Sequence, residues 1–169
     1  MSRGTIGRRF LLAAAIALSA SGAAHAQLPR QNPANCKGQP ELKPLQPLTV
    51  TTPKGAFKFS VELADSPRER EYGLMCRKAL AADRGMLFAF ARADYQAFWM
   101  RNTLIPLDII YIGSDGRVVS VVRNAQPLNE APLPSAAPAQ FVLELAAGRA
   151  AQIGLLPGDR VQHRVIAGG

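Results

Sequence analysis

The sequence has little of what most catalytic and metal sites are built from. Its 169 residues include two histidines and two cysteines, and only 19% of them are charged. His25 lies in a segment that we expect to be removed, which leaves His163 as the one imidazole of the mature protein. A single imidazole excludes most metal sites and most acid–base mechanisms that depend on two histidines.

Several short signatures are also missing. The sequence has no Gly-x-Ser-x-Gly elbow, no phosphate-binding loop, no dinucleotide fingerprint and no Cys-x-x-Cys pair. Met75, Cys76, Met86 and Met100 are soft sulfur donors that could suit copper(I), but their apolar neighbours favour core packing. We therefore expect no metal and no cofactor.

Positive charge is in moderate excess. The net charge is +8, and the loss of three arginines, Arg3, Arg8 and Arg9, with an N-terminal leader would reduce it to +5. The densest basic stretch, residues 68–78, interleaves its arginines with glutamates, a pattern typical of a solvated helix face. Nucleic acid is therefore not expected as a partner.

The first 26 residues have the pattern of a secretory signal peptide. A basic start is followed by an apolar run at 10–18 and by Ala24-His25-Ala26, with small residues where a signal peptidase reads the chain. We expect cleavage after Ala26, a periplasmic or secreted mature protein that begins at Gln27, and no stable membrane insertion after cleavage. The alternative is an uncleaved anchor, although the apolar run is shorter than the roughly 20 residues that cross a bilayer.

Both cysteines, Cys36 and Cys76, belong to the expected mature protein. Export permits oxidation, and unpaired thiols are uncommon in exported proteins, which favours a Cys36–Cys76 disulfide over two unrelated thiols. Residues 27–47 are rich in proline and are expected to form a linker or arm. Residues 48–169 are long enough for a single globular domain with one core.

Strand patterns dominate that domain. Two helices are expected, one beginning at Asp65 or Ser66 and ended by Gly73, the other over 147–153. Four prolines in residues 124–138 predict a long loop without regular structure. Alternating and apolar runs predict strands over 48–52, 56–64, 85–90, 95–101, 107–112, 117–122, 140–145 and 160–166. This order favours an α+β fold with a compact, mainly antiparallel, barrel-like sheet and two short helices.

A set of spaced motifs resembles the domain-of-unknown-function 192 family of small prokaryotic proteins. The motifs are Gly73-Leu74-Met75 with Arg77, Gly85-Met86-Leu87-Phe88, Phe98-Trp99-Met100 with Asn102-Thr103, Ile105-Pro106-Leu107-Asp108-Ile109, Leu143-Glu144-Leu145 with Gly148, Gly154, and Gly158-Asp159. The resemblance covers about residues 48–166. It implies a compact single-domain fold, frequent export and no assigned reaction.

The stretch 99–108 holds the residues that are hardest to explain by packing alone. Alternation in the strand over 107–112 places Asp108 on one face with Ile110 and Ile112, where a buried carboxylate must find partners. One hypothesis is a structural lock, in which Asp108 bonds the Asn102-Thr103 turn or an arginine among Arg77, Arg84 and Arg101. The other is a small-ligand pocket formed by Trp99, Asn102, Thr103, Asp108 and Glu144.

Three functions follow from these residues. The first is an exported binding or accessory module of the cell envelope, with an unknown small molecule or an envelope protein as its partner. The second is a hydrolase-type enzyme that uses Asp108 and Glu144 as acid and base. The third is a structural partner-binding protein with an apolar patch around Trp99. The lack of a recognisable nucleophile and base favours the first.

Overall fold

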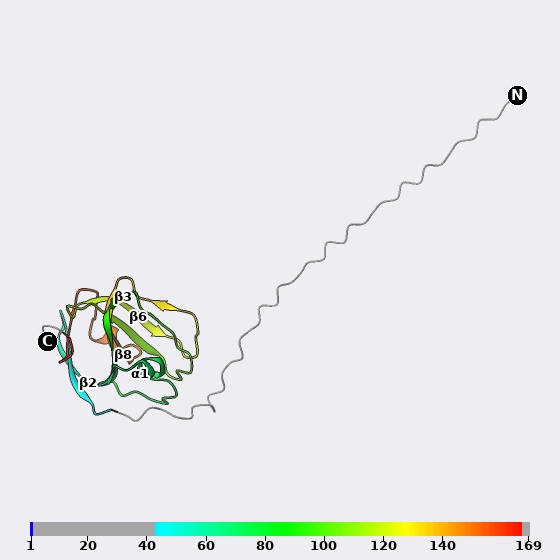
Figure 1. Ribbon diagram of the computed structural model, residues 1–169. Helices are drawn as coiled ribbons and strands as arrows, with labels where there is room; N and C mark the ends of the chain where they lie inside the picture. The colour runs from blue at the N-terminus through cyan, green and yellow to red at the C-terminus, as the bar shows by residue number, and fades with distance from the viewer. Residues whose placement is uncertain (2–42, 167–169) are drawn as a thin grey trace. The chain divides into compact units, whose positions relative to one another are not determined.

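The computed structural model describes residue 1 and residues 43–166 (Figure 1). The expected cleavage site after Ala26, most of the arm over 27–47, and Cys36 lie outside the described residues. Within the described part, no helix is long and apolar enough to cross a membrane.

The described residues form nine strands and two short helices. In chain order they are β1 (Gln46–Thr52), β2 (Gly55–Ala64), α1 (Pro67–Tyr72), β3 (Arg84–Asp94), β4 (Ala97–Phe98), β5 (Leu107–Ile112), β6 (Val118–Ala125), β7 (Leu133–Pro134), β8 (Ala139–Ala146), α2 (Arg149–Gln152) and β9 (Arg160–Gln162). Seven strands make one sheet in the order β6-β5-β8-β3-β2-β1-β9, and β4 pairs with β7.

The local sequence explains where α1 begins and ends. Ser66 is the N-cap, and its side chain accepts a hydrogen bond from the Glu69 N–H, while the Glu69 carboxylate accepts one from the Ser66 N–H. Pro67 occupies the first turn, where its missing N–H costs nothing. Gly73 ends the helix with a φ of 50°. The predicted start and end of this helix are confirmed.

Three predicted segments differ from the structure. Of residues 95–101, only Ala97–Phe98 form a strand, because the chain then turns and the Met100 N–H bonds the Asn129 carbonyl at 2.8 Å. The proline-rich 124–138 stretch is not wholly irregular, since β7 pairs with β4 inside it. The last strand ends at Gln162, and a turn follows in which the Ile166 N–H bonds the His163 carbonyl at 2.9 Å.

The large sheet is mixed. The β2–β3 pair is parallel, with α1 in the connection between the two strands, whereas β1–β2, β1–β9, β3–β8, β5–β8 and β5–β6 are antiparallel. The expectation of a mainly antiparallel sheet therefore holds for most pairs, and the parallel pair is the exception.

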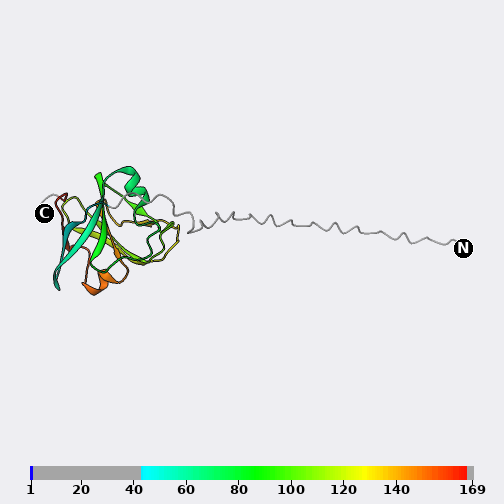
Figure 2. The ribbon, with the colours of Figure 1, turned by 90° about the horizontal axis from the view of Figure 1, so that it is seen from below.

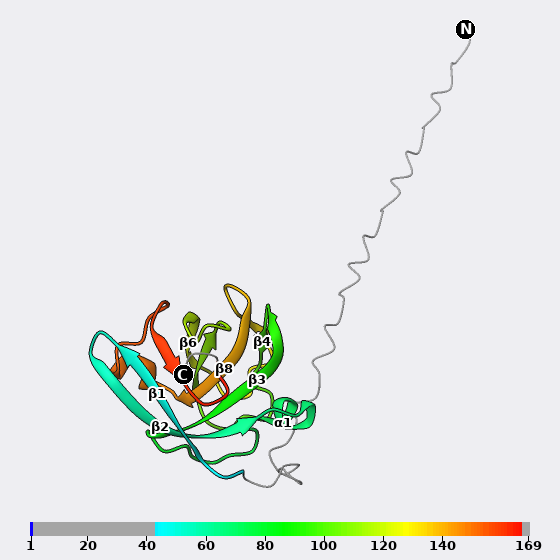
Figure 3. The same cartoon turned by 60° about the vertical axis from the view of Figure 1, so that its left-hand side comes forward.

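The sheet is curved so strongly that its two edges approach each other (Figure 3). Val118 of β6 and Val161 of β9 belong to the same buried cluster although their strands lie at opposite ends of the sheet. The Val118 N–H bonds the Asp159 carbonyl at 2.8 Å, and the Val161 N–H bonds the Gly116 carbonyl at 2.8 Å. The barrel-like expectation fits this arrangement.

The two faces of the sheet carry separate hydrophobic clusters. Along β5, Ile110 and Ile112 belong to one cluster, and Ile109 and Tyr111 to the other, as the alternation of a strand requires. We call the concave face with Ile110 the inner face and the opposite one the outer face. Figure 2 shows α1 (green) and α2 (orange) on opposite sides of the sheet, with α2 on the inner face.

Candidate functional site

Two adjoining pockets lie on the outer face beside α1. The inner pocket, with a volume of about 260 Å³, is lined by Glu144 together with residues of α1, β3 and the 96–103 segment. The outer pocket, of about 320 Å³, is lined by Arg68, Arg101, Asn102 and the residues it shares with the inner pocket. The shared residues are Glu71, Tyr72, Met75 and Trp99. The two pockets therefore adjoin each other along these four residues.

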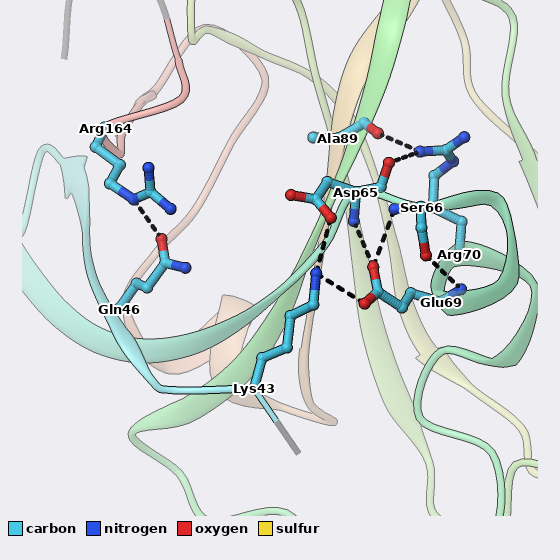
Figure 4. A network of polar contacts seen from close by, with 8 residues as sticks. All are labelled: Lys43, Gln46, Asp65, Ser66, Glu69, Arg70, Ala89 and Arg164. Atoms are coloured by element: carbon cyan, nitrogen blue, oxygen red, sulfur yellow. Dashed lines mark hydrogen bonds and ion pairs between the residues drawn. The ribbon is translucent and has the colours of Figure 1, made fainter. Parts of the chain in front are cut away.

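A polar network holds α1, which supplies one wall, against the sheet (Figure 4). The Lys43 ammonium group lies 2.8 Å from Asp65 Oδ1 and 2.7 Å from Glu69 Oε1. Its hydrogen bond lowers the pKa of Glu69 to about 2. On the other side of the helix, Arg70 donates to the Ala89 carbonyl of β3 at 3.0 Å. Both ends of α1 are thus tied to neighbouring segments.

Glu144 of β8 is the buried acid of the inner pocket. It pairs with Met86 of β3 on one side and with Ile109 of β5 on the other, in the middle of the sheet. Glu144 is 5% exposed, and none of the described residues forms a hydrogen bond or an ion pair with its carboxyl group. Burial raises the pKa of Glu144 to about 8. At neutral pH the group is a carboxylic acid, with an O–H that can donate.

Aromatic rings form a wall of the inner pocket beside the acid. Phe98 of β4 meets Phe88 of β3 edge to face, with ring centres 4.9 Å apart, and it contacts Phe90 and Tyr111 in similar geometry at 6.5 and 6.1 Å. Tyr111 donates its hydroxyl hydrogen to the Leu133 carbonyl of β7. The wall is therefore built from rings that fix one another's positions.

Gly73 allows the chain after α1 to pass close to the floor of the inner pocket. Its φ of 50° lies in the region that favours glycine. A Cβ at this position would lie 3.1 Å from the ring of Phe88 and 4.0 Å from Oε2 of Glu144. Glycine therefore lets the backbone itself contact the residues that line the pocket.

Trp99 marks the boundary between the two pockets. It is the only tryptophan of the chain and is 43% exposed. The Arg101 guanidinium lies over its ring, 5.4 Å from the centre. Such stacking restrains both side chains while it leaves the N–H groups of the arginine available.

Unusual backbone conformations occur at Asn102, which lines the outer pocket, and at two residues that bond the backbone of residues 102 and 103. Cys76, Asn102 and Leu128 have φ values of 65°, 54° and 60°, which non-glycine residues rarely adopt. The Cys76 N–H bonds the Asn102 carbonyl at 2.8 Å, and the Leu128 N–H bonds the Thr103 carbonyl at 3.1 Å. Strain of this kind is concentrated at binding and catalytic sites in proteins.

The structure places Asp108 away from both pockets, on the inner face. It is fully buried, and its Oδ1 accepts from the Asn124 N–H at 2.9 Å while Oδ2 accepts from the Ala150 N–H at 2.8 Å. Gly148, the N-cap of α2, has no side chain to cap the helix, and Asp108 fills that role. Asp108 does hold parts of the fold together, as the lock hypothesis expects, but the elements that it bonds are β6 and α2 rather than the Asn102-Thr103 turn.

The partners expected for Asp108 were wrong. Arg77 contacts Glu62 at 2.7 Å, and the bonds to Asp108 come from backbone N–H groups rather than from Arg84, Arg101, Asn102 or Thr103. The Asp108–Glu144 acid–base pair was also wrong. Asp108 pairs with Leu145 and Ile109 pairs with Glu144, so the two carboxyl groups project from opposite faces of the sheet.

The other predicted site residues divide between the two pockets. Trp99 lines both, Thr103 and Glu144 line the inner one, and Asn102 lines the outer one. Met86 and Met100 are buried in the outer-face core, as expected, whereas Met75 lines both pockets. The described residues contain no group of three or more histidine, cysteine, aspartate or glutamate side chains that could hold a metal ion.

His163 lies outside the two pockets, in the turn after β9. It is 4% exposed, its Nδ1 accepts a long 3.4 Å bond from the Val165 N–H, and its Nε2 has no partner within the described part of the chain. Burial lowers the pKa of His163, so the imidazole is neutral at pH 7. We assign it a place in packing rather than in the site.

Sequence reasoning missed the contribution of α1 and the aromatic wall. Tyr72, Gly73, Phe88 and Phe98 come from three separate segments that share no motif spacing. The one available signal was that Gly73, Phe88 and Phe98 belong to motifs of the family resemblance. The position of Phe98 beside the other residues depends on the pairing of β4, which contains Phe98, with β7.

Comparisons with known proteins agree with this fold. The profile of the DUF192 family, described as "Uncharacterized ACR, COG1430", matches residues 49–163. A protein of unknown function from Novosphingobium aromaticivorans DSM 12444 is 44% identical, with a TM-score of 0.69 over 75% of this chain and 94% of that one. A Sinorhizobium meliloti 1021 protein, provisionally described as a transcription regulator, is 39% identical, with a TM-score of 0.70 over 75% and 98%. No curated protein matches the chain.

Proposed function

This chain belongs to the DUF192 family of uncharacterised proteins, and we propose that it is an exported binding module that takes up a small, largely apolar ligand in the inner pocket. The signal-peptide pattern of residues 1–26 supports export, and the periplasm or the cell exterior would be the place where the module works. The ligand's apolar part would lie against Phe88, Phe98 and Trp99. A hydrogen-bond acceptor on the ligand would face Glu144.

One observation carries this proposal. Glu144 is buried at the floor of a pocket, and no described residue satisfies its carboxyl group. A carboxyl group in such a pocket gives up part of its hydration, which costs free energy that no described protein group restores. A ligand that accepts a hydrogen bond from Glu144 would recover it, and the aromatic wall would bury the ligand's apolar surface.

The protonation of Glu144 gives the proposal a pH dependence. The other titratable groups around the inner pocket are Arg70, Glu71 and Tyr72 of α1 and Tyr111 of β5. Arg70 is already bonded to backbone carbonyls and lies over the Phe90 ring. Below its pKa of about 8, Glu144 donates to the ligand; above it, a buried carboxylate repels an acceptor oxygen. Binding should therefore weaken as the pH rises through 8.

The test uses butyrophenone, a neutral aryl ketone whose carbonyl only accepts hydrogen bonds. Because Trp99 is the single tryptophan, its indole N–H gives one NMR signal that reports on the pocket. We expect a saturable shift of this signal at pH 6.5 and a weaker affinity at pH 9. Glu144→Gln should keep binding and lose the pH dependence, because an amide N–H still donates but does not titrate.

Glu144→Leu is the matched control, because leucine is of similar size and cannot donate. We expect it to weaken butyrophenone binding by roughly tenfold, which corresponds to the typical free-energy contribution of one hydrogen bond to a buried group. Equal affinity for wild type, Glu144→Gln and Glu144→Leu would show that Glu144 is not an anchor. No saturable shift in any of the three proteins would overturn the proposed pocket.

A further inference from the structure

Two cationic side chains at the outer pocket have no anionic partner. Arg68 of α1 and Arg101 both line this pocket, and no described residue forms an ion pair or a hydrogen bond with either guanidinium. Arg101 is restrained by its stacking on Trp99. Arginine N–H groups held in this way are well suited to a carboxylate or another planar anion.

The lining of the outer pocket is therefore positive, with two arginines against the single carboxylate of Glu71. The inner pocket differs in kind, since aromatic rings and the uncharged acid of Glu144 line it. The two pockets share Trp99 and Met75, so one molecule can extend from one to the other. The pair of pockets therefore has an aromatic end, which contains the acid, and a cationic end.

From this polarity we infer that the ligand class is an elongated amphipathic anion, with its apolar body in the inner pocket and its acidic group between Arg68 and Arg101. The inference rests on the proposed function. It adds the charge of the ligand and its orientation across the two pockets. Organic cations, which the aromatic rings alone could accommodate, are disfavoured by the two arginines. Solvent reaches the outer pocket, so the preference for an anion is expected to be moderate.

Three probes with the same aryl ketone body test the charge. They are benzoylbutyrate, its neutral methyl ester, and a trimethylammonium analogue of equal length, each titrated while the Trp99 indole N–H signal is followed. We expect benzoylbutyrate to bind roughly tenfold more tightly than the ester, and the ammonium compound to bind most weakly. Added salt should reduce the advantage of the anion and leave the ester unaffected.

The double variant Arg68→Gln/Arg101→Gln should reduce benzoylbutyrate to the affinity of the ester. Arg92→Gln is the matched control, because Arg92 is an exposed arginine of β3 that lines neither pocket, and it should change nothing. Equal affinities for acid and ester in wild type, or tightest binding of the ammonium compound, would overturn this inference. The proposed function would survive that result, because the ester would still bind. If none of the three probes binds, both fail.

Discussion

At the scale of single residues, the chain contains two buried acids in neighbouring strands with opposite chemistry. Asp108 accepts two backbone N–H bonds, from Asn124 and Ala150, so both of its carboxyl oxygens have partners. Glu144 receives none, and burial holds it in its neutral form at pH 7. The difference follows from the face of the sheet onto which each residue projects. One acid holds elements of the fold together, and the other is the one for which we propose a ligand.

Replacing Asp108 with asparagine tests the lock. An amide keeps one acceptor oxygen but directs N–H groups towards one of the two backbone donors, and the charge-assisted bonds are lost. We expect the free energy of unfolding to fall by about 1.5 to 3 kcal/mol, measured by urea denaturation. Butyrophenone binding should be unchanged, because Asp108 does not line either pocket.

Asp83→Asn is the control for this prediction, because Asp83 is exposed and its carboxylate has no partner within the described residues. Its effect should stay within about 0.5 kcal/mol. A similarly small effect of Asp108→Asn would show that the two backbone bonds do not lock β6 and α2 together.

At the scale of elements, the segment after α1 connects the pocket to the expected disulfide. Gly73 and Met75 line the inner pocket, and Cys76 follows directly, with its N–H bonded to the Asn102 carbonyl. Cys36 lies outside the described residues, so the Cys36–Cys76 bridge stays a prediction.

Peptide mapping without reduction should show one linked pair, Cys36–Cys76, in protein purified from the envelope. The bridge would close a loop of about 41 residues, and the chain-entropy estimate gives it roughly 4 kcal/mol of stability. Reduction should therefore lower the melting temperature, and the double variant Cys36→Ser/Cys76→Ser should melt as the reduced protein does. Two thiols that alkylate readily in native, unreduced protein would rule the bridge out.

At the scale of the whole molecule, the main prediction concerns maturation. Residues 1–26 should be removed on export, because an apolar run after three arginines ends at Ala24-His25-Ala26. Intact-mass measurement of protein from the periplasm or medium should give a chain that begins at Gln27. Replacing Ala26 with tyrosine should block cleavage and leave the full-length mass. A full-length mass for the wild type would contradict the signal peptide.

The sequence allowed most of the elements to be predicted. The strands β1, β2, β5 and β8 and the helix α1 were found within about two residues of their observed bounds, because alternation, turn residues and the capping pair of Ser66 and Glu69 are local signals. Two of the three segments that differed, 95–101 and 124–138, contain the strands of the β4–β7 pair, so the structure of each depends on the other. No local pattern reports such a contact.

By itself the sequence determined the barrel-like class of fold, the family, the faces of β5 and the burial of Asp108, all of which depend on period, spacing and composition. Only the tertiary structure decided which groups surround Asp108 and Glu144. The β5–β8 register places Asp108 and Glu144 on opposite faces, and the loops that follow bring α2 to one and the aromatic wall to the other. Register and long-range packing are set by the whole chain at once, because a shift of one residue exchanges every side chain between the faces.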